Sequence, residues 1–178
     1  MKTAVVILNW NGQKLLKQFL PTVLLHSKND AEVYVVDNAS TDGSVQFLKQ
    51  HFPDITLIQN PSNYGYAKGY NEGLKNINAE LYVLLNSDVE VTENWLNPVK
   101  EEFIKNQQVA AAQPKIVDLK NKKYFEYAGA AGGFIDKFGY PYCRGRIFNT
   151  IEKDTGQYDD STTILWASGA CLFVRKKY

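Results

Sequence analysis

Four short apolar runs, each followed by a longer segment with helical spacing, limit most strongly how this chain can fold. The runs have the length of buried strands, and the apolar residues after each run recur every three or four positions, as on one face of a helix. Strands that alternate with helices predict an α/β fold, with an open, mostly parallel sheet covered by helices on both faces. We predict the strands at 4–8, 33–36, 55–58 and 81–85.

The segments between these runs give the expected helices. We expect a first helix around 15–24, bent at Pro21, and a second helix capped by Ser40 or Asp42. The other helices are predicted after the loop 60–69, up to about Ile77, and at 95–106.

Beyond Val109 the alternation ends. The segment 127–146 is rich in glycine and aromatic residues, so we expect irregular loops or short antiparallel strands there, followed by one more buried strand at Ile164–Val174. No internal repeat or interdomain linker divides the sequence, and 178 residues is an ordinary size for one domain. We therefore expect a single domain, 1–178.

The charge and the apolar runs exclude some classes of protein. Twenty basic residues balance nineteen acidic ones, which is unlike a nucleic-acid-binding domain, so no nucleic-acid partner is expected. No apolar stretch approaches the roughly 20 residues of a membrane span, and the run 4–8 is too short for a signal peptide. The two cysteines lack metal-binding spacing. We expect a cytoplasmic protein, with peripheral contact to the inner face of the membrane left open.

Polar residues gather at the carboxyl end of each predicted strand, where open parallel sheets bind their ligands. The four groups are Asn9 with Asn11, Asp37 with Asn38, the segment 60–65, and Asn86 to Asp88. Asparagine and aspartate also favour turns for local reasons, so each group taken alone has a structural explanation. Together they favour a ligand site along this edge of the sheet.

The end of the fourth strand indicates what such a ligand could carry. If the chain stays extended, Asn86, Asp88 and Glu90 lie on one side, with about 7 Å between alternate residues. Oxygen-bearing side chains in a row suit a hard cation and the phosphates it carries, although solvated loop residues would look the same. Glycine-rich dinucleotide, P-loop and nucleophile-elbow motifs do not occur, which disfavours an oxidoreductase, a P-loop nucleotidase and a hydrolase.

Five segments, in order and with suitable spacing, carry a family resemblance. The chain resembles the family 2 glycosyltransferases, most closely the bacterial rhamnosyltransferase-like branch that builds cell-surface polysaccharide, in VVILNWNG, VYVVDNASTDGS, NYGYAKGYNEGL, LYVLLNSDVEV and WASGACLFVRK. The resemblance implies a GT-A fold and an inverting transfer of sugar from a nucleotide-diphosphate donor to a glycan or lipid-linked acceptor. It also implies Mg²⁺ or Mn²⁺ at the diphosphate.

The resemblance further implies roles for residues at the strand ends. Asp37 would accept a hydrogen bond from the nucleotide base, and Asp88, which matches the last residue of the family's Asp-x-Asp motif, would hold the metal. Asn86 replaces the first acid of that motif, so we expect weak metal binding without the donor. The remaining donor-binding residues that the resemblance implies, beside Asn86, are Asn9, Asn38, Asn63, Gly65 and Asn71.

The catalytic base is expected outside these motifs. In the family it lies in an acidic, aromatic-rich stretch after the segment that matches GACLFVRK, so we expect it beyond Tyr178, in a longer protein of which this chain is an N-terminal part. Such a fragment would bind the donor without transferring sugar. Asp154, Asp159 and Asp160 are nearby acids that could replace the base or simply be solvated. Trp166 could form an acceptor wall or belong to the core.

Two other functions fit many of the same residues. A nucleotide-sugar-binding module without catalysis would need the same donor site but would release no product. A sugar nucleotidyltransferase shares the parallel sheet and the metal, but it would need a glycine-rich, basic loop after the first strand, and NWNGQKLL does not supply one.

Overall fold

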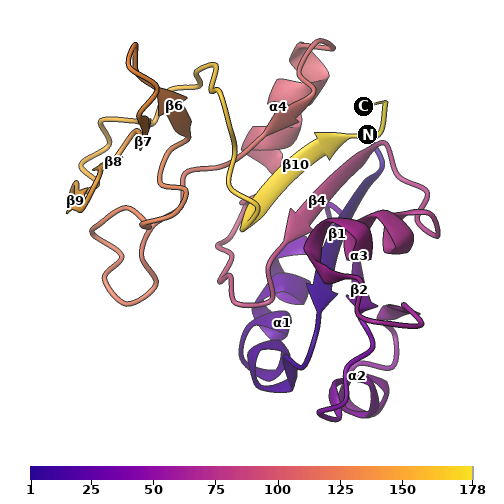
Figure 1. Ribbon diagram of the computed structural model, residues 1–178. Coiled ribbons are helices and arrows are strands. Elements are labelled where there is room, and N and C mark those ends of the chain that lie inside the picture. The colour runs from indigo at the N-terminus through magenta and orange to yellow at the C-terminus, as the bar shows by residue number, and fades with distance from the viewer. Residues whose placement is uncertain (178) are drawn as a thin grey trace.

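A sheet of mostly parallel strands forms the centre of the molecule. Within residues 1–177, which the computed structural model describes, this main sheet has six strands in the order β3-β2-β1-β4-β10-β5 (Figure 1). Its parallel strands are β1 (Thr3–Asn9), β2 (Glu32–Asp37), β3 (Thr56–Gln59) and β4 (Leu81–Leu85). The predicted parallel sheet is therefore confirmed, and β4 has the limits that the apolar run predicts.

The last strand of the main sheet comes from the far end of the chain. β10 (Cys171–Arg175) lies antiparallel between β4 and the short strand β5 (Ala111–Ala112). The predicted start of this strand at Ile164 is wrong. Residues 164–166 instead lie against another part of the chain, where the carbonyl of Trp166 accepts a hydrogen bond from the amide of Gly133, 3.1 Å away.

Helices cover both faces of the main sheet, as predicted (Figure 1). α1 (Gln13–Ser27), α2 (Ser44–His51) and α4 (Asn97–Lys105) contribute to the apolar core on one face, whereas α3 (Gly65–Leu74) contributes to the core on the other. Among the helices of residues 1–177, none is both long and apolar enough to cross a membrane.

The alternation of side chains along β1 explains why its sequence is apolar throughout. Val5 and Ile7 belong to the core beneath α1, α2 and α4, and Ala4 and Val6 belong to the core beneath α3. A strand that is buried on both faces has no polar side to reveal its period.

Two helix starts differ from the prediction. The cap of α2 is Gly43, with φ of 86°, rather than Ser40 or Asp42. Glycine adopts this left-handed conformation without strain, and Asp42 still accepts a hydrogen bond from the amide of Ser44 at 3.1 Å. α3 begins at Gly65, inside the predicted loop 60–69. α1 continues as a helix on both sides of Pro21.

Residues 113–170, which we call the small lobe, lie beside the main sheet (Figure 1). They contain the antiparallel strands β6 (Gly133–Ile135), β7 (Pro141–Cys143), β8 (Arg146–Ile147) and β9 (Thr150–Ile151). A separate small core of buried residues consists of Phe125, Ala130 and Cys143. The expectation of loops and short antiparallel strands is confirmed.

Candidate functional site

The loops after β1 and β2 are joined by buried polar side chains. Asn9 and Asp37 are 0% and 1% exposed, and the Nδ2 of Asn9 donates to Asp37 Oδ1 (3.0 Å) and to Ser40 Oγ (3.1 Å). The amide of Ser40 donates to Asp37 Oδ2 at 2.9 Å. Each oxygen of Asp37 thus accepts one hydrogen bond from the protein and keeps a second lone pair.

Further contacts between the same two loops fix their separation. The amide of Asn11 donates to Ser40 Oγ (2.9 Å), and Asn11 Oδ1 accepts from the amide of Thr41 (2.7 Å). Asn11 and Ala39 both have positive φ, 52° and 60°, which is an uncommon conformation for residues other than glycine. The network keeps these two residues in place at the carboxyl edge of the sheet.

One buried acceptor of this network has no partner among residues 1–177. Asn9 Oδ1 is enclosed by the protein, and a Cβ built on Gly12 would collide with it. Buried polar atoms in proteins are nearly always hydrogen-bonded, so an orphaned acceptor here suits a water molecule or a donor group of a ligand.

Asn38 connects the end of β2 to the segment that opens α3. Its Nδ2 donates to Asn63 Oδ1 (2.7 Å) and to the carbonyl of Gly65 (3.1 Å). Its Oδ1 accepts from Asn60 Nδ2 (3.0 Å) and from the amide of Tyr64 (3.2 Å). Both N–H groups and both lone pairs of the Asn38 side chain are used inside the protein, so this residue shapes the edge. Asn71, by contrast, lies on the exposed side of α3.

The end of β4 presents one free carboxylate. Asp88 is exposed, and its side chain has no hydrogen bond or ion pair with any residue that the structure describes. The row of three oxygen-bearing side chains predicted from strand alternation is wrong, because the strand stops at Leu85 and Glu90 is ion-paired with Lys122. Asn86 is half-buried, and its backbone N–H donates to the carbonyl of Ala170 at 2.9 Å.

These residues fit a cation only if phosphate and water oxygens provide most of the atoms that coordinate it. Within residues 1–177 no group of three or more histidine, cysteine, aspartate or glutamate side chains could hold a metal. Mg²⁺ is usually bound by one or two carboxylates together with phosphates and water. Asp88 meets that requirement at the edge of the sheet, so the donor set fits a metal that arrives with a diphosphate.

The acids considered as alternative bases are all ion-paired. Asp154 and Asp159 both contact Lys115, the first at 2.7 Å, and Asp160 contacts Arg144. Hydrogen bonding to Lys115 holds the pKa of Asp154 below its usual value, and Arg144 has the same effect on the pKa of Asp160. A lowered pKa makes a carboxylate a weaker proton acceptor.

Trp166 lies in the small lobe and packs against its core. It is half-buried beside Phe125, Ala130 and Cys143, and its indole occupies the space that a side chain at position 133 would need. This packing supports the core interpretation of Trp166 over an acceptor wall.

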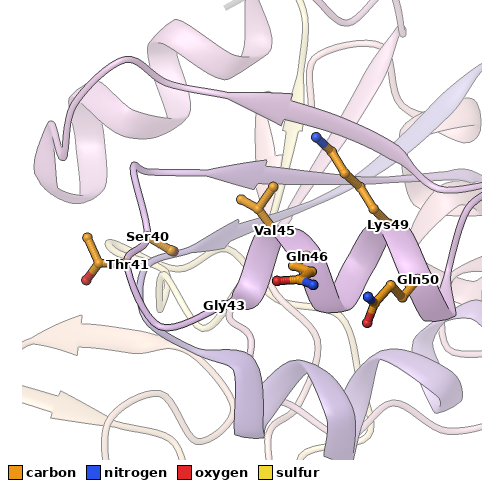
Figure 2. A pocket seen from close by; sticks show the side chains of 7 residues that line it. All are labelled: Ser40, Thr41, Gly43, Val45, Gln46, Lys49 and Gln50. Carbon is orange, nitrogen blue, oxygen red and sulfur yellow. The ribbon is translucent and has the colours of Figure 1, made fainter.

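A surface hollow of about 470 Å³ lies along α2 (Figure 2). It shares only Ser40 and Thr41 with the polar edge, and the rest of its lining comes from α2 and the residue before it. These lining residues are Gly43, Val45, Gln46, Lys49 and Gln50. None of them carries a feature that a phosphate or a metal would require beyond a single lysine, so the candidate site is the edge itself.

A comparison with protein families identifies the family of this chain. The sequence model of glycosyl transferase family 2 matches residues 4–177, which includes every strand end described above. The chain belongs to glycosyl transferase family 2.

Curated proteins that are similar to this chain are longer than it. The chain is 22% identical, over 97% of its length, to an N-acetylglucosaminyl-diphospho-decaprenol L-rhamnosyltransferase of Mycobacterium tuberculosis (strain ATCC 25618 / H37Rv), and it spans 61% of that protein. It is also 26% identical, over 79% of its length, to N-acetylgalactosaminyltransferase 6 of Drosophila melanogaster, of which it spans 20%.

Solved structures show the same fold. The structure of S. aureus TarS 1-349 matches 76% of this chain, and 41% of its own length, with a TM-score of 0.60 and 20% identity. The mannosyltransferase PcManGT from Pyrobaculum calidifontis, in complex with GDP-Man and Mn²⁺, matches 64% of this chain, and 35% of its own length, with a TM-score of 0.56 and 23% identity. The GT-A architecture expected from the sequence is confirmed.

The structure also brings residues to this edge that sequence reasoning missed. Trp10 follows β1 directly and is 57% exposed, although tryptophan is a residue that folded proteins usually cover. Ser40 accepts two of the hydrogen bonds that join the loops, and Tyr66 bonds to Gly169 across the edge. The sequence offered one signal for these residues, the large aromatic Trp10 between Asn9 and Asn11.

Proposed function

We propose that the chain binds a nucleotide-diphosphate sugar along the carboxyl ends of β1, β2 and β4, and that this protein transfers the sugar, with inversion, to a glycan or lipid-linked acceptor in cell-surface polysaccharide synthesis. Membership of glycosyl transferase family 2 supports the reaction class. The similar solved structures that hold GDP-Man with Mn²⁺, or UDP-GlcNAc, support this kind of donor.

The nucleoside is assigned to the β1 and β2 side of the edge. Asp37 and Asn9 keep acceptor lone pairs there that a base or ribose can use, and the exposed ring of Trp10 offers a surface for stacking. Asn63 and Gly65, which Asn38 holds in place, form the adjoining boundary of the donor site.

The diphosphate is assigned to the end of β4. Asp88 would hold Mg²⁺ or Mn²⁺ together with the phosphate oxygens, and Asn86 lies beside it as a neutral neighbour. When bound, the metal offsets the negative charge of the departing nucleoside diphosphate, as a Lewis acid does. Asp88 itself orients the diphosphate, and the loops after β1 and β2 keep the nucleoside in line with it.

The free carboxylate of Asp88 is the observation that carries this proposal, and a matched pair of variants tests it. Thermal shifts with UDP-, GDP- and dTDP-sugars in Mn²⁺ first identify the donor, because a ligand that binds the folded state raises its stability. Asp88→Asn should then weaken donor binding in Mn²⁺ and change little in EDTA. Glu90→Gln is the control, because Glu90 is already paired with Lys122.

Two results would count against the metal assignment. An equal loss of affinity for Asp88→Asn in Mn²⁺ and in EDTA would indicate a structural role. An equal effect of Glu90→Gln would show that any acid near β4 acts through its charge alone. If no nucleotide sugar shifts the melting temperature, the donor assignment itself is wrong.

A further inference from the structure

The first turn of α3 is joined to the segment before β10 by a single side-chain hydrogen bond. Tyr66 Oη donates to the carbonyl of Gly169 at 2.7 Å, between residues that are far apart in the sequence. The next carbonyl, of Ala170, accepts from the amide of Asn86. The segment that the Tyr66 hydroxyl binds is therefore also bonded to Asn86, the residue after β4 and two positions before Asp88.

A second tyrosine, one turn further along α3, reinforces this contact. Tyr70 is buried, donates to the carbonyl of Leu85 at 3.1 Å, and packs edge-on against the ring of Tyr66 with 5.0 Å between ring centres. Tyr66 itself is 48% exposed, so its ring lies at the surface of the same edge. The Tyr70 hydroxyl thus binds the backbone at the carboxyl end of β4, and the Tyr66 hydroxyl binds the backbone just before β10.

The partner of Tyr66 leaves no space for a side chain. A Cβ on Gly169 would lie 2.6 Å from Tyr66 Oη and 3.2 Å from its Cζ. Glycine at this position is what permits the close approach of the hydroxyl to the backbone.

Both ends of the contact are held by other bonds. On one side, the amide of Ser168 donates to Gln113 Oε1 at 2.6 Å, which fixes the segment that carries Gly169. On the other side, Asn63 Oδ1 accepts from the amide of Gly65 and from Asn38, which fixes the residues just before Tyr66. The Tyr66 bond is the link between these two anchored parts.

We propose that Tyr66 is a positioning residue, whose hydrogen bond to Gly169 sets the separation between the donor-site boundary at Asn63–Gly65 and the strand end at Asp88. The proposal rests on the proposed function. A nucleoside diphosphate contacts both sides of this separation, whereas a free nucleoside contacts only the β1 and β2 side. Loss of the bond should therefore weaken binding of the diphosphate and leave binding of the nucleoside unchanged.

The conservative variant Tyr66→Phe tests this difference. Calorimetry in Mn²⁺ would use UDP, GDP or dTDP, whichever the donor screen selects, and the matching free nucleoside. Removal of one hydrogen bond predicts a loss of about threefold to tenfold in diphosphate affinity, with no change for the nucleoside. A merely structural role would lower both affinities together, or neither.

Tyr82→Phe is the matched control. Tyr82 is buried near the start of β4, and its hydroxyl donates to the carbonyl of Ile77 at 2.9 Å, so the variant loses a similar bond at the opposite end of the strand. It should lower the melting temperature without changing either affinity. If Tyr82→Phe weakens the diphosphate as much as Tyr66→Phe does, the positioning role is refuted.

A second pair of variants probes the contact from the other side. Gly169→Ala places a methyl group against Tyr66 Oη, so it should also weaken diphosphate binding. In the Tyr66→Phe background this oxygen is gone and the nearest ring atom is at 3.2 Å, so adding Gly169→Ala should cost little more. Additive losses in the double variant would contradict a direct contact between these residues.

The outcomes separate this inference from the function on which it rests. If the wild-type chain binds a nucleoside diphosphate and Tyr66→Phe binds it equally well, only the role of Tyr66 is wrong. If the wild-type chain binds none of the three diphosphates, the donor site and the role of Tyr66 are both wrong.

Discussion

The main sheet and the small lobe are stabilised by different interactions. The main sheet buries apolar side chains on both faces, and its carboxyl edge is held by hydrogen bonds among asparagine, aspartate and serine side chains. The small lobe has a core of a few residues around Phe125, and ion pairs of Lys115 and Arg144 connect its loops. It also exposes large apolar side chains, such as Phe138 at 73% and Phe148 at 63%. The contrast indicates that the small lobe has less stabilising burial than the main sheet.

The largest expected effect compares two fully buried phenylalanines, one in each region. Phe173 lies in the main core and Phe125 in the core of the small lobe. Truncation of a buried phenylalanine typically costs about 3–5 kcal/mol. Phe173→Ala should lower the global stability by this amount in urea denaturation. Phe125→Ala should increase amide hydrogen exchange within 113–170 and leave β1, β2 and β4 protected. Equal loss of protection everywhere would show that the two regions unfold together.

An intermediate effect is expected for the polar edge of the main sheet. Asp37→Ala removes the acceptor of the Ser40 amide and one acceptor of Asn9, both in a buried setting. The expected cost is about 1–3 kcal/mol of unfolding free energy, together with weaker binding of the free nucleoside. Asp54→Ala, at an exposed position, is the control. Unchanged nucleoside affinity in a folded Asp37→Ala variant would remove this residue from base recognition.

The smallest effect concerns the charges of the small lobe. The pKa of Asp154 is lowered in the folded state by Lys115, so the ion pair contributes fully above the ordinary aspartate pKa of 3.8 and is lost as the pH falls below it. The contribution should be about 1 kcal/mol or less, because ion pairs near the surface are weak. Amide NMR signals of the small lobe should broaden as the pH falls below 3.8, before those of the main sheet. Lys115→Met should abolish the difference.

Much of the main sheet could be predicted because its local pattern and its tertiary environment agree. Leu81–Leu85 is buried on both faces between two strands, so an uninterrupted apolar run marks its limits well. Ile164 and Trp166 also belong to an apolar run that predicted a buried strand, but they are apolar for a different reason. Ile164 lies against Gly132 and Trp166 against Gly133, and these contacts depend on a distant segment that no local pattern reveals.

The convergence of polar side chains on the carboxyl edge could also be predicted, but the use of each side chain could not. Asparagines and aspartates do converge on the carboxyl edge of the sheet. However, all four hydrogen bonds of the Asn38 side chain are made to residues 60–65, and Glu90 is ion-paired with Lys122. Each of these partners comes from another part of the chain, so the free acid, Asp88, could be distinguished from the paired acids only in three dimensions.

The placement of β10 has a consequence for how the protein is made. Phe173 pairs with Val83 on one side and with Ala112 on the other, so within residues 1–177 β5 joins the sheet through a strand that is synthesised much later. While a ribosome is still extending the chain, β4 has an open edge whose backbone groups can pair with a neighbouring nascent chain. Pairings between residues so distant in sequence also form slowly. Chaperone binding to the growing chain should therefore persist until residue 175 has emerged, and a messenger truncated before codon 171 should yield aggregates.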